Sequence, residues 1–180
     1  MKVGELYSVM CLIFATNFKG VIDKNHFENM AKNWIVKNDN AENIKGHEYW
    51  EKSIKNENYE NVVKDFESLK DSFDTVYFKL NDSAKVDDFF KNIKFKKPFE
   101  ELNSSHISNI LVLLSGILKQ DKDEKSHMLL GYVLTQYYIH PARALASYLQ
   151  ENANSDYYKA IGYFLADFCN LLKTSLALKA

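Results

Sequence analysis

This sequence contains few residues that break helices or form turns. Its 180 residues include two prolines and six glycines, too few for the many tight turns of a β-sandwich or β-barrel. The chain also lacks an excess of charge of one sign, since 23 basic and 24 acidic residues leave a net charge of −1. No bulk electrostatic attraction therefore draws it to nucleic acid or to an anionic membrane.

Cysteine and long apolar runs are equally scarce. Cys11 and Cys169 stand far apart and form neither a C-x-x-C pair nor a zinc-binding pattern. The apolar run 110–118 is less than half the length of a membrane span. The run 9–15 is short, follows Glu5 and has no cleavage site after it, so it does not fit a secretory leader. We therefore expect a reduced protein of the cytoplasm.

Motifs of known catalytic chemistry are missing as well. The sequence contains no glycine-rich phosphate loop, no G-x-S-x-G elbow and no H-E-x-x-H. Glu124 and His127 form one E-x-x-H, the spacing of di-iron bundles, but such a site needs a second copy and two further inward-facing glutamates. We expect no enzymatic activity, no metal and no cofactor, and keep a metal-dependent helical-bundle enzyme as an alternative.

Apolar residues at helical spacing dominate what is present. We find no alternating strand pattern and expect an all-α protein of about seven to nine helices. Residues 3–16 predict the first helix, and Asp23 predicts the N-cap of a second helix that runs to about Val36. The stretch 37–46, rich in asparagine, predicts a loop.

The rest of the chain continues the helical pattern. An apolar stripe from Glu57 to Leu80 predicts a helix of about six turns, its last two turns free to bend into a loop. Cap residues and prolines then mark the later helix starts and ends. They are Ser83 as an N-cap, Lys96-Lys97-Pro98 as an end, Asn103-Ser104-Ser105 before an apolar helix through Lys119, Asp121 with Glu124 before a helix to about Tyr138, Pro141 in a first turn, and Ser155 as the last N-cap.

Charge is more informative locally than in total. Between Glu57 and Asp82 there are seven acidic residues and three lysines, a net charge of −4. One interpretation is a solvated face beside a core stripe. The other is a binding surface for a basic peptide, with an apolar groove formed by some of the aromatic residues that make up 14% of the chain.

Four stretches together resemble the TorD/DmsD-type redox-enzyme maturation chaperones. Asp65-Phe66-Glu67-Ser68-Leu69 is similar to that family's E-Y-x-R-L-F, and residues 72–77 are similar to its P-x-E-S-V-Y. Ser105-His106-Ile107 resembles D-H-I-x-x-E-L, with Ser105 in place of the acid and Ile110 in place of the glutamate. His140 and the aromatic residues of 156–168 resemble the family's C-terminal segment.

The resemblance implies a cytoplasmic, non-enzymatic chaperone with one all-helical domain over residues 1–180. It implies an N-terminal lobe at about 1–96, a C-terminal lobe at about 104–180 and a hinge near 97–106. The implied partner is the precursor of a molybdenum-containing oxidoreductase, held by its twin-arginine signal peptide or its apoenzyme until the cofactor is inserted. A hinged helical protein is compatible with a monomer or with a domain-swapped dimer.

The resemblance also names candidate binding residues. Asp74 is expected to pair with arginine, and His106 to orient the hinge or donate a hydrogen bond. Apolar walls are expected from Phe66, Leu69 and Tyr77, although core packing is an alternative for the first two. The same stretches add Thr75 and Ser105 as binding candidates, and His140 and Tyr158 as structural ones. The alternative function is a helical adaptor or regulatory module without a redox-enzyme client.

Overall fold

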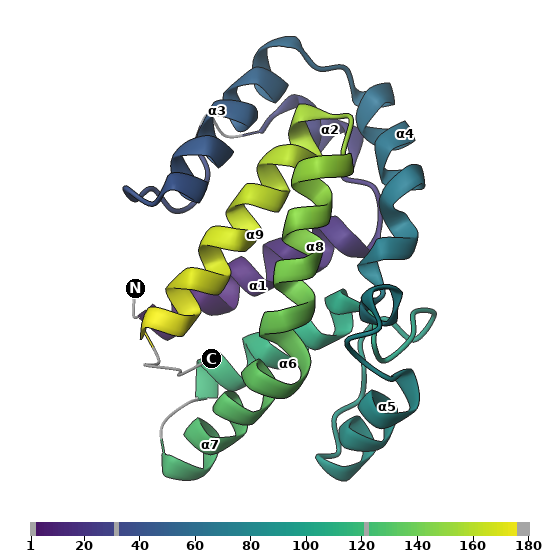
Figure 1. Cartoon of the computed structure of the whole chain (residues 1–180), viewed down its shortest axis with the longest axis vertical. Coiled ribbons are helices and arrows are strands. Elements are labelled where there is room, and N and C mark those ends of the chain that lie inside the picture. Colours follow the sequence, from purple (N-terminus) through teal and green to yellow (C-terminus); the bar gives the residue numbers. More distant parts are fainter. Residues whose placement is uncertain (1–2, 31–32, 121–122, 176–180) are drawn as a thin grey trace.

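The computed structural model describes residues 3–30, 33–120 and 123–175. Across those residues the chain is helical and forms no β-sheet, which confirms the all-α prediction (Figure 1). The α-helices are α1 (Val3–Lys19), α2 (Lys24–Glu28), α3 (Ala41–Asn56), α4 (Tyr59–Leu69), α5 (Ser83–Asn92), α6 (Ile107–Gln120), α7 (Glu124–Val133), α8 (Ile139–Asn152) and α9 (Asp156–Ser175). Within the same ranges, no helix has both the length and the apolar composition that a bilayer crossing requires.

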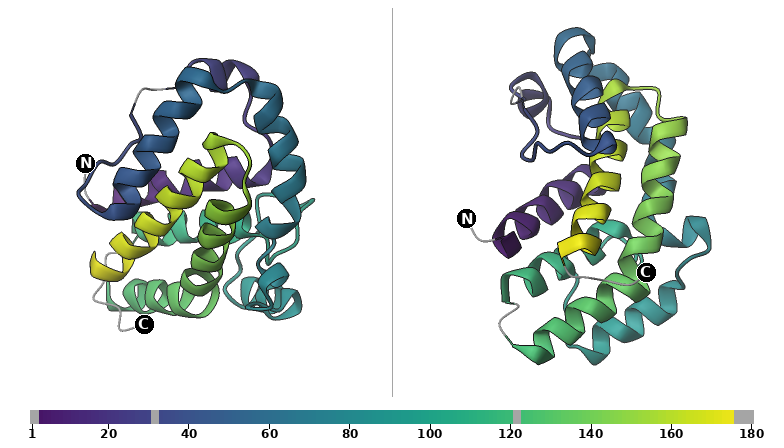
Figure 2. Two further views of the ribbon diagram at one scale, coloured as in Figure 1. Left: turned by 45° about the horizontal axis from the view of Figure 1, so that its top comes forward. Right: turned by 60° about the vertical axis from the view of Figure 1, so that its left-hand side comes forward.

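The core lies between two helix pairs that cross. α8 and α9 pack side by side, and α1 and α6 pack together behind them (Figures 1 and 2). α6 is buried on more than one face, as its apolar sequence predicts. The ring of Phe14 in α1 lies 5.7 Å from that of Phe168 in α9 and 5.5 Å from that of Trp34, measured between ring centroids. Aromatic contacts therefore join the two pairs.

Two of the packed pairs bring together segments from either side of residues 97–106. α1 packs along α6, and α3 packs along α9. The described residues form a single compact domain (Figure 2). The division of that domain into two lobes with a hinge stays a prediction.

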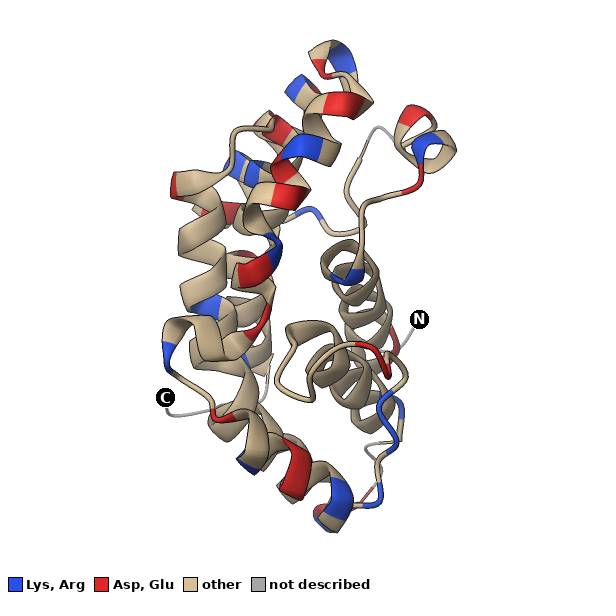
Figure 3. Ribbon diagram, turned by 90° about the vertical axis from the view of Figure 1, so that its right-hand side faces the viewer, with Lys and Arg blue, Asp and Glu red and all other residues tan. Residues whose placement is uncertain are grey.

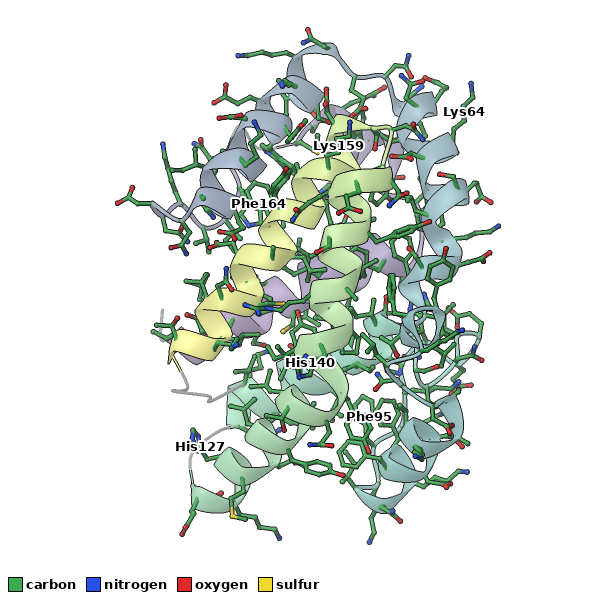
Figure 4. The ribbon with its side chains drawn as sticks, in the orientation of Figure 1. Lys64, Phe95, His127, His140, Lys159 and Phe164 are labelled. Carbon is green, nitrogen blue, oxygen red and sulfur yellow. The ribbon has the colours of Figure 1, made fainter. Side chains whose placement is uncertain are left out.

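α3 is a helix where a loop was predicted up to residue 46. Its buried positions are Asn43, Gly46, Trp50 and Ser53, which recur at helical spacing but include only one large apolar side chain. Gly46 lies against the ring of Phe164 on α9, which Figure 4 labels. The predicted loop was wrong because small and polar residues form the buried face of this helix.

The second helix is much shorter than the apolar pattern predicts. Asp23 is the N-cap of α2, as predicted, and its carboxylate accepts the N–H of His26 at 3.1 Å. The helix nevertheless ends at Glu28 instead of Val36. Asn29 follows it, and its side-chain amide donates to the carbonyl of Asn25 at 2.8 Å, which satisfies one of the terminal carbonyls.

The helix that begins after Glu57 also ends earlier than the six turns that the apolar stripe predicts. α4 ends at Leu69, and two 3₁₀ turns follow, η1 (Lys70–Phe73) and η2 (Thr75–Phe78). Between them Asp74 is extended and forms an isolated antiparallel bridge with His106. A pairing between residues 32 positions apart in the sequence therefore overrides the helical periodicity.

Several of the later helix starts were predicted within a few residues. Ser155 caps α9 as predicted, since its Oγ accepts the N–H of Tyr158 at 3.1 Å. The N-cap of α5 is Asp82 instead of Ser83, because the Asp82 carboxylate accepts the N–H groups of residues 84 and 85. α7 is capped by Asp123, whereas the predicted Asp121 lies outside the described residues.

α7 and α8 are joined without a loop by the π-helical turn η3 (Leu134–Tyr138). Pro141 lies in the first turn of α8, as predicted, and has no N–H to donate to the carbonyl of Tyr137. Asn81 supplies that hydrogen bond instead, from its Nδ2 at 3.2 Å. The segment after η2 is thereby held against the start of α8.

Candidate functional site

A polar cleft of about 380 Å³ opens where the end of α1, the end of α4 with η1, and the segment before α6 meet. Three of the predicted binding residues line it, namely Phe66, Asp74 and His106. They come from three stretches that are separate in the sequence. The structure therefore brings three of the seven predicted binding residues together in one cleft, which we call the acidic cleft.

The bridge between Asp74 and His106 is fixed by the residues beside it. Thr75 donates twice to the carbonyl of Ser105, from its N–H at 3.2 Å and from its Oγ1 at 2.7 Å. Asn81 donates to the same Oγ1 at 2.9 Å. Thr75 and Ser105 are almost completely buried, so their role here is to hold the two cleft residues next to one another.

Asp74 keeps much of its capacity to accept hydrogen bonds. Its Oδ1 accepts the N–H of Val76 at 3.2 Å, and its Oδ2 accepts the side-chain amide of Asn103 at 2.8 Å. Two carboxylate oxygens offer about four lone-pair sites. The half-buried carboxylate is therefore oriented by two neighbours and can still accept bonds from a guanidinium in the cleft.

His106 is a neutral N-cap at the start of α6. Its Nδ1 accepts the N–H of Ser108 at 3.2 Å, which places the ring proton on Nε2. Burial lowers the pKa of His106 to about 4, although the nearby charges of Asp74 and Glu101 act in the opposite direction. At neutral pH the ring therefore offers an N–H donor and carries no positive charge that would repel a cation.

The charges of the cleft favour a cationic ligand. Three carboxylates line it, those of Asp71, Asp74 and Glu101. The two lysines that also line it are engaged elsewhere, because Lys70 pairs with Glu67 at 2.6 Å and the Lys19 ammonium lies 4.8 Å from the centre of the Phe99 ring. Figure 3 views the molecule from the side of α4 and marks the acidic and basic positions along it.

Among the predicted apolar walls, only Phe66 lines the cleft, and it is itself 8% exposed and packs in the hydrophobic core, which is the alternative given for it. Leu69 is 2% exposed and packs in the hydrophobic core, which is the alternative that its place on the stripe left open. Tyr77 lies outside the lining on η2, where it is 48% exposed. Its hydroxyl donates to that of Tyr148 on α8 at 3.3 Å, and the two ring centroids are 5.5 Å apart.

The two structural candidates differ in their surroundings. Tyr158 is fully buried in α9, with its ring 6.3 Å from that of Phe66 and 6.2 Å from that of Phe73, between centroids. It therefore supports the cleft wall from behind. His140 is exposed on α8, where Figure 4 labels it, and it does not line the acidic cleft.

Two acidic residues of the stretch 57–82 point inward and cap α9. The Asp65 carboxylate accepts the N–H of Asn154 at 3.1 Å and both the N–H and the Oγ of Ser155, at 2.8 and 2.6 Å. Glu57 accepts the N–H groups of Asp156 and Tyr157 at 2.9 Å each. These carboxylates satisfy the free N–H groups of a helix start, which accounts for their charge without a bound peptide.

This double cap was not predicted from the sequence. In the sequence, Asp65 and Glu57 are simply members of an acidic stretch. The N–H groups that they accept lie about 90 and 100 residues further along the chain. The one available signal was the position of Ser155, which was predicted as the N-cap of α9. It marks a helix start whose N–H groups need acceptors.

The metal and thiol chemistry of the described residues is simple. Across residues 3–30, 33–120 and 123–175, no three His, Cys, Asp or Glu side chains are placed together to bind a metal ion. Cys11 and Cys169 are free thiols in the core, and burial raises the pKa of Cys169 to about 12. A thiol held in its protonated form is a poor nucleophile.

Comparisons of the chain with protein-family models, with curated proteins and with solved structures found no match. The resemblance to the TorD/DmsD-type chaperones thus rests on the motifs and their arrangement and stays a prediction.

Proposed function

We propose that this protein is a cytoplasmic chaperone that binds the twin-arginine signal peptide of an exported molybdenum-containing oxidoreductase. It would hold the precursor, through the signal peptide and through parts of the apoenzyme, until the cofactor has been inserted. The acidic cleft is the proposed binding site for the arginine pair. The chaperone itself would carry out no chemical step in this function.

One observation carries the proposal. Phe66, Asp74 and His106 come from the three stretches that resemble the family's binding motifs, and all three line one cleft. Two of the stretches follow one another directly along the chain, but the third lies about 30 residues further on and reaches them through the Asp74–His106 bridge. Packing of the core alone does not require that these stretches meet at a surface cleft.

The chemistry of the cleft suits arginine in particular. A guanidinium presents its N–H donors as a planar fork that matches a carboxylate, whereas a lysine ammonium is a point charge. Asp74 supplies an oriented carboxylate, and Asp71 and Glu101 add negative charge at the rim. Hydrogen bonds to a charged group contribute roughly 1.5–3 kcal/mol each. Two arginines that bond to these carboxylates would therefore contribute to the affinity for the leader and to its selection over a leader with lysines.

Calorimetric titration tests the proposal. The ligands are synthetic twin-arginine leader peptides from the source genome, together with copies in which both arginines are lysine. We expect at least one natural leader to bind, and its two-lysine copy to bind about tenfold or more weakly. Absence of binding by every leader, or equal affinity for the arginine and lysine forms, would refute the proposal.

A pair of charge-neutral variants locates the site. Asp74→Asn removes one of the three carboxylates that line the cleft but retains an acceptor for the Val76 N–H. Glu60→Gln removes one negative charge from an exposed position on α4 outside the cleft. We expect Asp74→Asn to weaken leader binding about five- to thirty-fold, a loss of about 1–2 kcal/mol, and Glu60→Gln to leave it unchanged.

A second candidate function is supported by the exposed apolar residues of α7. Met128 is 70% exposed and Tyr132 is 47% exposed, and they lie four residues apart on one face of that helix. Such a face suits a helical adaptor that docks a folded partner. A pull-down that recovers a cytoplasmic protein, in which Met128→Ser abolishes the recovery and no redox enzyme is found, would favour the adaptor over the chaperone.

A further inference from the structure

The acidic cleft is bordered on one side by residues 99–103, a segment that is neither helix nor strand. Three of its residues line the cleft, namely Glu101, Leu102 and Asn103. We call this segment the cleft rim. Irregular backbone keeps one position only where other groups satisfy its N–H and C=O groups. The contacts of the rim therefore decide how well the cleft is formed before a ligand binds.

A buried asparagine in the first turn of α6 fixes both ends of the cleft rim. Asn109 is fully buried, and its Oδ1 accepts the N–H of Phe99 at 3.2 Å. Its Nδ2 donates to the carbonyls of Phe99 and Asn103, at 3.2 and 3.0 Å. Between these two ends, the Lys97 ammonium donates to the carbonyl of Leu102. Because one packed side chain makes three of these bonds, the ends of the rim keep a fixed separation.

The residues that follow the cleft rim are fixed as well. The Oγ of Ser104 donates to the Asp87 carboxylate on α5 at 2.8 Å. The carbonyl of Ser105 accepts the two hydrogen bonds from Thr75 that are described above. A binding site whose walls are fixed in advance loses less conformational entropy when a ligand binds. The cleft rim is therefore preorganised.

Asn103, the last residue of the cleft rim, places its side-chain amide on the Asp74 carboxylate. Its Nδ2 donates to the Asp74 Oδ2 at 2.8 Å, which is the one hydrogen bond of the Asn103 side chain within the described residues. The backbone of Asn103 is held separately, since its carbonyl accepts the N–H of His106 at 3.0 Å and the Asn109 amide. A substitution of the side chain therefore removes the contact with Asp74 and leaves the rim in place.

The orientation of the Asp74 carboxylate affects arginine and lysine differently. The torsion that turns a carboxylate group is broad, but here the Val76 N–H on Oδ1 and the Asn103 amide on Oδ2 hold its plane. The planar fork of a guanidinium bonds to both oxygens only when that plane suits it, whereas a lysine ammonium, a point charge, needs one oxygen. Building on the proposed function, we infer that Asn103 is a positioning residue that makes the acidic cleft select arginine over lysine.

Two substitutions separate the amide of Asn103 from its bulk. Asn103→Leu keeps the size of the side chain and removes the amide, and Asn103→Gln keeps an amide on a longer side chain. The position is exposed, so both variants of the full chain should fold. Asn92→Leu is the matched control, because Asn92 is an exposed asparagine at the end of α5 that does not line the cleft.

The probes are the N-acetylated dipeptide amides of arginine and of lysine, titrated in NMR while the backbone amide signals of Asp74 and Val76 are followed. We expect the arginine probe to bind the unaltered protein about tenfold more tightly than the lysine probe. Asn103→Leu should weaken the arginine probe about fivefold and leave the lysine probe unchanged, because only the fork requires a fixed plane. Asn103→Gln should keep most of the preference for arginine, and Asn92→Leu all of it. In the Asp74→Asn background, Asn103→Leu should cause no further change in that preference.

The outcomes separate the inference from the function on which it rests. A merely structural role for Asn103 would weaken both probes alike, so equal weakening by Asn103→Leu, an unchanged preference, or the same preference in Asn103→Leu and Asn103→Gln would overturn the inference. The variants are also titrated with a twin-arginine leader and its two-lysine copy. If the leader binds selectively to the unaltered protein and to Asn103→Leu alike, the inference is wrong and the proposed function stands.

The opposite result is equally clear. If the dipeptide probes show the preference and its dependence on Asn103 but no leader binds, the proposed function alone is wrong. If neither the probes nor any leader binds, both are wrong.

Discussion

Replacing Asp65 by asparagine tests the double cap at the start of α9. The substitution keeps the size of the side chain but removes its charge and turns one oxygen into an N–H donor. The carboxylate now accepts two backbone N–H groups, those of Asn154 and Ser155, and the Ser155 hydroxyl. The Asn154 N–H lies 3.1 Å from both oxygens, so an amide oxygen in the place of Oδ2 would face all three donors. That oxygen has only two lone pairs, so at least one donor would lose its hydrogen bond.

The expected loss of stability follows from these contacts. A buried donor left without an acceptor costs roughly 1–3 kcal/mol, and removal of a negative charge from a helix N-terminus costs about 0.5–1 kcal/mol more. We therefore expect Asp65→Asn to lower the free energy of unfolding by about 3 kcal/mol. Because a domain of this size is stabilised by about 5–15 kcal/mol in total, the variant should remain folded.

Urea denaturation followed by circular dichroism measures this loss. We expect an unchanged slope and a midpoint lower by about 1–3 M, since slopes of about 1–3 kcal/mol per molar urea are typical. Thermal unfolding should shift down by about 6–12 °C. Glu60→Gln, which removes one charge from the exposed face of α4, is the control and should stay within about 0.5 kcal/mol of the unaltered protein. An equally small effect for Asp65→Asn would refute the capping argument.

Two further predictions concern stability. The pKa of His106 is lowered from its ordinary 6.5 to about 4. As the pH falls, the unfolded chain therefore binds the proton before the folded protein does. The free energy of unfolding should decrease by about 3 kcal/mol in all between pH 6.5 and pH 4. The difference in unfolding free energy between the unaltered protein and His106→Asn should shrink by that amount over this window, and a constant difference would contradict the burial of a neutral ring. At Gly46 an added Cβ would lie 2.6 Å from the ring of Phe164, whereas at Gly116 it would have open space. Gly46→Ala should therefore destabilise the protein by about 1–3 kcal/mol, and Gly116→Ala should stabilise it by about 0.5–1 kcal/mol. Urea denaturation measures both effects. Equal effects of the two substitutions would contradict the close packing of α3 on α9.

The sequence predicted the parts of the fold that large apolar residues define. α1, α6 and α9 follow from dense helical patterns, and Asp23 and Ser155 follow from local cap chemistry. α3 could not be predicted in the same way, because its buried face consists mostly of Asn43, Gly46 and Ser53. Asn43 is tolerated there because its Nδ2 donates to the Asp167 carboxylate on α9 at 2.8 Å, a partner 124 residues away.

Contacts between residues distant in the sequence also limited the prediction of the candidate site. The order of the motifs was enough to place Phe66, Asp74 and His106 in one cleft. It was not enough to show that Phe66 lines the cleft while Leu69 does not, although both are buried in the core. Nor did it separate the inward Asp65 from Asp74, whose carboxylate lines the cleft. These distinctions depend on where α4 ends and the 3₁₀ turns begin, which a contact distant in sequence decides.

A double-mutant cycle between the cleft and the leader tests the central claim most directly. The two proteins are the unaltered chain and Asp74→Asn, and the two peptides are a binding leader and its copy with both arginines replaced by glutamine. If Asp74 pairs with the arginines, calorimetry should give a coupling energy of about 1 kcal/mol or more, because each single change removes the same interaction. Free-energy losses that add within about 0.3–0.5 kcal/mol would show that the arginines bind elsewhere and would contradict the account.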